Sequence, residues 1–199
     1  MTAAIGCAAR GSRGFSLVEL IVIMTIVGII IGIAVPSYRY VTNSNRVSSE
    51  VNLLLGDMQF ARSEAVKEGS PVAVCPGTAT TSGTTITGTC LTSGASWQGG
   101  WIVFSNVAGD GVVGTNDQVL RVQPQLNSND TFVSNDSNVK AVVFNREGLT
   151  PSIPTTDTSG VVIKLNATPA IQQWERCLVI SFVGVMQTLH GGTSPCTVP

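Results

Sequence analysis

A single apolar segment near the start of the chain constrains the fold more than any other feature of the sequence. From Leu17 to Val35 the chain carries one ionisable residue, Glu19. An α-helix needs about 20 apolar residues to cross the hydrocarbon core of a bilayer. We therefore expect this segment to be a helix in a membrane, with the rest of the chain attached to its end.

The flanks of the apolar segment differ from those of a secretory signal peptide. Arg10 and Arg13 precede the segment and no small-residue cleavage site follows it, whereas a signal peptide is cut after its apolar region. Glu19 is also unusual, because a carboxylate at mid-membrane costs about 2.5–3.5 kcal/mol and usually marks a function. The alternative for Glu19 is that it reaches the lipid headgroups from its place near the start of the helix.

The residues at the start of the apolar segment match a known processing signal. Residues 14–20 read Gly-Phe-Ser-Leu-Val-Glu-Leu, and with the apolar run that follows they resemble the signal of type IV pilins and type II secretion pseudopilins. The resemblance implies that prepilin peptidase cuts after Gly14 and methylates the new amino terminus at Phe15. It also places the family's characteristic glutamate at Glu19 and its helix-bending proline at Pro36.

The physical chemistry of Glu19 agrees with this resemblance. Cleavage after Gly14 would leave a cationic amine on Phe15 at the helix N-terminus, one turn before Glu19. A negative charge in this place interacts favourably with the helix dipole and with the amine. Our hypothesis is that the amine of a neighbouring subunit neutralises Glu19 in lipid, which would make it an assembly residue that sets the register of one helix on another.

A second, amphipathic stretch follows Pro36 and predicts that the helix continues to Glu68. Its apolar residues recur at steps of three and four, which is the pattern of one buried helix face. Charged residues fill the other face, and Gly69 and Pro71 end the helix. The apolar face contains Val47, Val51, Leu54, Leu55, Met58, Ala61 and Ala65, and the charged face contains Arg46, Glu50, Asp57, Arg62, Glu64 and Lys67. We expect one helix from Phe15 to Glu68, with a kink at Pro36.

Beyond the helix the pattern changes to the short β-branched and aromatic runs of β-strands. They predict an antiparallel sheet that covers the apolar face of the helix, because the sheet alone and the helix alone would each leave apolar surface in water. Residues Pro76–Ser96 and Asn127–Asn138 have the composition of polar surface loops, and Asn145–Gly148 that of a tight turn with a positive φ at Gly148. The expected strands are Val72–Cys75, Trp101–Phe104, Val119–Gln123, Lys140–Phe144, Val161–Leu165 and Arg176–Val183, with Val185–Leu189 as a final edge strand.

These patterns predict an α+β fold in which a long N-terminal helix packs on an antiparallel β-sheet domain. We divide the chain into a leader at 1–14 that is cleaved, the transmembrane half of the helix at 15–38, and a globular domain at 39–199. The globular domain includes the amphipathic half of the helix to about residue 68 and has the size of one ordinary domain.

Four cysteines remain after the leader, Cys75, Cys90, Cys177 and Cys196. An even number in an exported domain argues for disulfides. Three pairings are open, and short loops favour Cys75 with Cys90 and Cys177 with Cys196; closing a loop of about 15 residues stabilises a fold by on the order of 3 kcal/mol. A zinc site is the rival, but no Cys-x-x-Cys spacing is present and His190 is the only histidine, so we expect no metal.

The charge and the histidine content argue against nucleic-acid binding and against catalysis. The formal net charge is −1 and falls to −3 once the two leader arginines are lost, which is not the basic balance of a phosphate-backbone binder. His190 lies near the tail, and nothing in the sequence orients it as a general base for a nucleophile. We therefore expect no enzyme and no cofactor.

One loop, at residues 106–117, carries candidate calcium ligands. Asp110, Asn116 and Asp117 supply carboxylate and amide oxygens, which calcium prefers. The loop lacks the ligand spacing of an EF-hand, so a solvated turn is the favoured interpretation.

Four patches of the globular part match one group of the same family. They read Ala-Arg-Ser-Glu-Ala at 61–65, Val-Ala-Val-Cys at 72–75, Trp-Gln-Gly-Gly-Trp-Ile-Val-Phe at 97–104 and Arg-Cys-Leu-Val-Ile-Ser at 176–181. These patches resemble the GspH/FimT/FimU minor pilins and pseudopilins. The resemblance implies a low-abundance subunit that primes fibre assembly and sits at the fibre tip. Its partners would be other minor and major pilins or pseudopilins, prepilin peptidase and inner-membrane lipid. The globular domain would lie in the periplasm before assembly and at the cell surface afterwards.

Two alternatives within the group remain open. Some members of the FimT branch resemble DNA receptors with a Gly-Arg-x-Arg motif near the C-terminus, but the matching place reads Gly184-Val185-Met186-Gln187. Without those guanidinium groups we expect little binding of nucleic acid. The paired cysteines favour a FimU-like pilus subunit over a GspH-type pseudopilin of a type II secretion system, which is the main alternative.

Overall fold

The computed structural model describes residues 14–82, 85–91, 96–126, 129–136, 139–151, 160–168, 172–191 and 196. The chain divides into two compact units, residues 1–42 and residues 43–199. Helix α1 (Leu17–Glu68) begins in the first unit and ends in the second. The predicted helix is therefore confirmed, and only its first two residues lie outside α1.

The first unit, where the structure describes it, is the apolar part of α1 with three preceding residues. An 18-residue window of this helix has a mean hydropathy of 2.8, and none of the window is buried within the chain. By length and composition the helix can cross a membrane. Pro36 lies inside α1, which continues past it; the kink at Pro36 stays a prediction.

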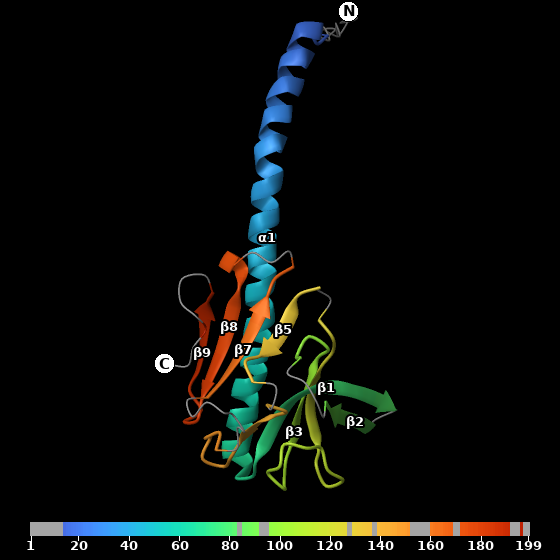
Figure 1. Cartoon of the computed structure of the whole chain (residues 1–199). Coiled ribbons are helices and arrows are strands. Elements are labelled where there is room, and N and C mark those ends of the chain that lie inside the picture. Colours follow the sequence, from blue (N-terminus) through green and yellow to red (C-terminus); the bar gives the residue numbers. More distant parts are fainter. Residues whose placement is uncertain are drawn as a thin grey trace, which may run out of the picture. The chain divides into compact units, whose positions relative to one another are not determined.

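The second unit consists of the later part of α1 and two antiparallel sheets (Figure 1). One sheet has the order β2-β1-β3-β4, with β6 also paired to β1, and the other has the order β5-β7-β8-β9. A 3-10 turn, η1 (Gln172–Trp174), precedes β8. The strands are β1 (Val72–Ser82), β2 (Thr85–Cys90), β3 (Trp101–Ser105), β4 (Val119–Gln123), β5 (Thr131–Ser134), β6 (Val142–Phe144), β7 (Gly160–Asn166), β8 (Arg176–Ser181) and β9 (Met186–His190).

The predicted α+β class is confirmed, but the expectation of one sheet is wrong, and parts of two predicted loops are strands. Within Pro76–Ser96, strand β1 continues to Ser82 and pairs with β2. This hairpin was missed because its threonines suit strands through their β-branch without giving an apolar alternation. Within Asn127–Asn138, β5 alternates exposed and buried side chains, which is the signal of a short half-buried strand.

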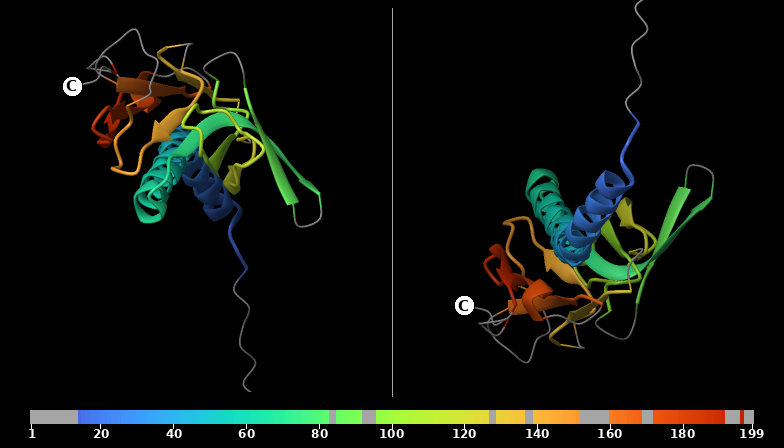
Figure 2. Two further views of the ribbon diagram at one scale, coloured as in Figure 1. Left: turned by 90° about the horizontal axis from the view of Figure 1, so that it is seen from below. Right: turned by 90° about the horizontal axis from the view of Figure 1, so that it is seen from above.

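The apolar face of α1 forms the centre of the core. Its residues contact apolar side chains of both sheets, including Trp101 of the first sheet and Ile163 and Leu178 of the second. End-on views show this part of α1 beside strands of both sheets (Figure 2). The buried members are Val47, Val51, Leu54, Met58, Ala61 and Ala65, each at most 1% exposed, so the predicted buried face is confirmed except that Leu55 is only partly buried.

The prediction that Asp57 lies on the solvated, charged face of α1 is wrong, because Asp57 is buried. Only 7% of the residue is exposed. Its carboxylate accepts hydrogen bonds from Trp101 Nε1 at 2.8 Å and from Arg121 Nη1 at 3.0 Å. The Arg121 guanidinium also lies 3.9 Å from the ring centre of Phe60. Asp57 therefore ties α1 to β3 and β4, which satisfies a buried indole N–H.

Arg46 ties α1 to the second sheet. Its Nε and Nη2 donate to the two carboxylate oxygens of Asp130 at 3.1 and 2.9 Å. The Asp130 side chain is fully buried and also accepts from the backbone N–H of Thr168. This bidentate pair holds the residues just before β5 and just after β7 against the helix.

Arg62 forms a third tie, to two glycine turns. Its Nε donates to the carbonyl of Gly148 at 3.0 Å. Gly148 has φ +74°, as predicted for the turn at 145–148, and Gly184 has φ +75°. A Cβ on Gly184 would lie 2.2 Å from the Gly148 carbonyl oxygen, so only glycine allows the two turns to meet here.

We predict that Asp57→Ala destabilises the second unit by about 2–3 kcal/mol, because it leaves a buried indole N–H without an acceptor. All three tryptophans of the chain lie between residues 97 and 174, so tryptophan fluorescence during urea unfolding of the detergent-solubilised chain reports on this unit. Glu64→Ala is the matched control on the same helix, since among the described residues the ion pair of Glu64 is a surface pair with Lys67. Equal unfolding midpoints for the two variants would contradict a structural role for Asp57.

Candidate functional site

The predicted cleavage junction lies just outside the helix. Gly14, Phe15 and Ser16 precede α1, and the Leu20 N–H donates to the Ser16 carbonyl as the first helical hydrogen bond. Phe15 is 73% exposed within the chain. The peptide bond between Gly14 and Phe15 is therefore not engaged in helical hydrogen bonding, which leaves it accessible to a peptidase.

Glu19 lies in the first turn of α1. A carboxylate there interacts favourably with the positive end of the helix dipole. Among the residues that the structure describes, the ion pairs do not include Glu19. A processed amine at Phe15 or a group of another chain could supply a cationic partner for Glu19.

The structure contains two disulfides, which join Cys75 to Cys90 and Cys177 to Cys196. These are the pairings that the sequence analysis favoured. The first connects β1 to the end of β2, and the second connects β8 to the C-terminal tail. The four residues belong to two small apolar clusters distinct from the core around α1. The bridges thus cover the strand faces that the helix does not reach.

One group in the described part of the chain has the residue types of a metal site. It consists of Glu175, Cys177 and Cys196, whose ligand atoms lie within 4.8 Å of one another. Both sulfurs are in the disulfide, however, and a metal is bound by thiolates. Glu175 forms an ion pair with Lys164. These residues therefore serve as a structural link between β7, β8 and the tail.

The candidate calcium loop at 106–117 is held by its own carboxylates. Asp110 accepts from the Val112 N–H and from Asn106 Nδ2, each at 3.0 Å. Asp117 accepts from the backbone N–H groups of Val107 and Gly114. The Val112 N–H and then the Asn106 amide hold the pKa of Asp110 below its usual value. Three of the four carboxylate oxygens of these two aspartates are therefore used to shape the turn.

Asn106, which the sequence analysis did not single out, is the centre of this loop. Its side chain is buried, its Oδ1 accepts from the Gly111 N–H, and its Nδ2 donates to the Val112 carbonyl as well as to Asp110. Asn116, the remaining candidate ligand, is exposed on the same loop.

Gly184, Val185 and Met186, the first three residues of the segment at 184–187, line an open groove of about 660 Å³ between the end of α1 and the turn before β9. The groove contains one arginine, Arg62, and one carboxylate, Glu147. The Nε of this arginine donates to the Gly148 carbonyl. This balance of charge does not match the row of cations that a phosphate backbone requires.

Known proteins resemble this chain in sequence over most of its length. Residues 50–184 match the family model described as type II transport protein GspH, and residues 9–35 match that of the prokaryotic N-terminal methylation motif. The chain is 42% identical over 57 residues to type II secretion system protein H of Pseudomonas aeruginosa, and 33% identical over 105 residues to type IV major fimbrial protein FimA of Dichelobacter nodosus. These matches cover 29% and 49% of this chain, and 33% and 65% of the relatives. The matched part thus spans less than two thirds of either relative.

The fold is similar to that of a solved structure. The type IV minor pilin FimU of Pseudomonas aeruginosa superposes with a TM-score of 0.55 over 77% of this chain and 97% of that chain. The sequence identity is 18%, so this likeness concerns the fold alone. It confirms the architecture of a helix on antiparallel sheets.

We predict that the 106–117 loop loosens on acidification and not on removal of calcium. A lowered pKa means that the ionised Asp110 stabilises the fold above the pKa of an unfolded aspartate, about 3.9, and that this contribution disappears as the pH falls through the lower folded pKa. Hydrogen-exchange protection of the Val112 amide should therefore persist at pH 6 with excess chelator and fall below about pH 4. Loss of protection with chelator at pH 6 would instead identify a calcium site.

Proposed function

Because this chain belongs to the GspH family of minor pilins and pseudopilins, we propose that it is a minor pilin that primes the assembly of a type IV pilus and sits at its tip. It acts as a structural subunit and not as a catalyst. The observation that carries the proposal is a single carboxylate in the first turn of an apolar helix that leads into a compact α+β unit. Such a carboxylate in lipid requires a partner, and a fibre of like helices supplies one.

Processing comes first in the proposed sequence of events. Prepilin peptidase removes residues 1–14 and methylates Phe15, in keeping with the match of residues 9–35 to the methylation motif. Residues 15–38 then remain in the inner membrane, and residues 39–199 lie in the periplasm. Assembly transfers the helix from lipid to the fibre and carries the second unit to the cell surface.

Glu19 is the proposed assembly residue. In lipid its charge is stabilised by the amine of Phe15, one turn away. Within the nascent fibre, the amine of a neighbouring subunit either replaces the Phe15 amine as the partner of Glu19 or pairs with Glu19 beside it. The exchange favours one axial position of the two helices, since only that position pairs the charges.

A second candidate function is supported by the secretion relatives. The matching family model is described as a type II transport protein, and one relative is named type II secretion system protein H. In that case the chain would be a minor pseudopilin, and the same processing and helix pairing would build a short periplasmic fibre. Deleting the gene distinguishes the two, because it removes surface fibres in the first case and protein secretion in the second.

We predict cleavage between Gly14 and Phe15. The bond precedes the helix, and its flanks match the processing signal. The intact mass of protein from a host with prepilin peptidase should correspond to residues 15–199 plus one methyl group. A mature chain that begins at Met1 or Thr2, or that is cut after Val35, would show that the signal is not used.

We predict that Glu19→Ala leaves the second unit folded and reduces crosslinks to other fibre subunits roughly tenfold or more, because a charged hydrogen bond contributes about 1.5–3 kcal/mol. Glu68→Ala is the matched control, since it removes a carboxylate from the exposed end of the same helix. The measurement is complementation of a gene deletion, scored by surface fibres and by secretion. If the Glu19→Ala variant complements the deletion fully and crosslinks to other subunits as the wild type does, then Glu19 only contacts the lipid headgroups.

A further inference from the structure

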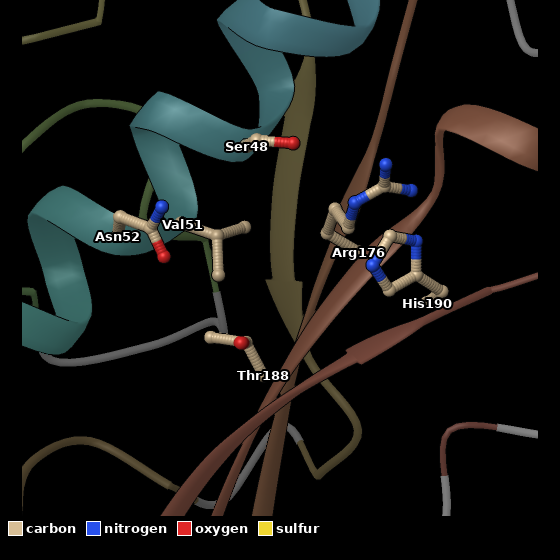
Figure 3. A pocket seen from close by; sticks show the side chains of 6 residues that line it. All are labelled: Ser48, Val51, Asn52, Arg176, Thr188 and His190. Atoms are coloured by element: carbon tan, nitrogen blue, oxygen red, sulfur yellow. The ribbon is translucent and has the colours of Figure 1, made fainter.

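A small polar pocket lies between α1 and β9, within the second unit (Figure 3). Its volume is about 110 Å³, well below the roughly 300–1,000 Å³ of sites for whole small molecules. It has room for one small functional group. It is lined by Ser48, Val51, Asn52, Arg176, Thr188 and His190.

Arg176 is the charged group of this pocket. It is 8% exposed, and the ion pairs between described residues do not include it. Its Nη1 donates to the carbonyls of Gln173 and Glu175, each at 3.0 Å. A guanidinium has five N–H donors. The hydrogen bonds that Arg176 forms with the described residues use Nη1 alone, which leaves the donors on Nε and Nη2 for a group that enters the pocket.

The other walls of the pocket add neutral donors around this cation. His190 is the cross-strand partner of Arg176, and their side chains lie together opposite Ser48 and Asn52 of the helix (Figure 3). The Asn52 amide, the Thr188 hydroxyl and the imidazole can each donate a hydrogen bond. The Ser48 hydroxyl already donates to the Ser44 carbonyl. The pocket therefore offers one full positive charge and several donors to an anion.

We propose that this pocket receives a carboxylate side chain of a neighbouring fibre subunit, an inference that rests on the proposed function. The planar fork of a guanidinium matches a carboxylate in a bidentate pair. One negative charge balances the one fixed positive charge of Arg176, whereas a phosphate would bring close to two. A carboxylate is also small enough to enter a pocket of this volume.

Strand β9, beside the pocket, provides a place where a segment of another chain can bind. Strand β9 is the last strand of its sheet and pairs with β8. The backbone groups of an edge strand can bind an extended segment of a second protein. A segment lying along β9 would carry alternate side chains on the face that holds Thr188 and His190. An aspartate or glutamate in such a position could extend past His190 toward Arg176.

The first test titrates the processed full chain in detergent micelles with N-acetylglutamate N-methylamide, while the side-chain Nε–H signal of Arg176 is followed by NMR. We expect this signal to shift in the millimolar range, and the neutral glutamine analogue to bind at least tenfold more weakly. An equal response to the glutamine analogue, or a stronger response to inorganic phosphate than to the glutamate probe, would overturn the assignment.

The second test fills the pocket with a carboxylate from the chain itself. Ser48→Asp places an anion on the helix side of the pocket, and Ser49→Asp is its matched control, because Ser49 is exposed and donates to Asn45 as Ser48 does to Ser44. We expect Ser48→Asp to have the melting temperature of the wild type and to bind the glutamate probe at least tenfold more weakly. It should also crosslink less to other subunits. Asn52→Asp should behave as Ser48→Asp does if the latter fails to fold.

The outcomes separate this inference from the proposed function. If Ser48→Asp binds the probe and assembles as Ser49→Asp does, the pocket is not a docking site, although gene deletion would still abolish fibres or secretion. If gene deletion affects neither surface fibres nor secretion, the proposed function fails, even if the Arg176 pocket binds the glutamate probe.

Discussion

The burial of one face of α1 against two β-sheets is the contact on which the rest of the structure depends. The strands that line the core alternate between this contact and the opposite face of their sheet. Residues such as Trp101 and Leu178 point to the helix, while Cys75 and Cys177 belong to clusters on the far faces. The disulfides therefore stabilise what the helix cannot reach, and the two sheets need the helix as their common core.

Three polar ties set where the helix lies on the sheets. Asp57, Arg46 and Arg62 are spaced along one helix, and each bonds to a different part of the unit. Desolvation offsets much of the attraction in such buried contacts. Their main effect is specificity, because a helix shifted by one turn would leave buried charges and the Trp101 indole without partners. A subunit that assembles through its helix needs the helix to hold one fixed position on the sheets, because the sheets are then carried with the helix into the fibre.

The sequence was sufficient for the features that depend on local periodicity. The buried face of α1 follows from steps of three and four, and β4 follows from a β-branched run at Val119–Gln123. Sequence reasoning missed β2, since a threonine-rich hairpin is held by backbone pairing, and it misplaced Asp57, whose burial depends on an indole 44 residues away. The Arg176 pocket joins helix and strand residues more than 120 positions apart, so no local pattern could predict it.

Under the proposed function, the chain carries one folded unit on a helix that enters a fibre. The most direct measurement is quantitative mass spectrometry of sheared, purified surface fibres beside the membrane fraction of the same cells. We predict peptides from the second unit in the fibres, at a small fraction of the amount of the major subunit, and no peptides from residues 1–14. Abundant fibres that contain no trace of this chain, in cells whose secretion is also independent of it, would contradict the account.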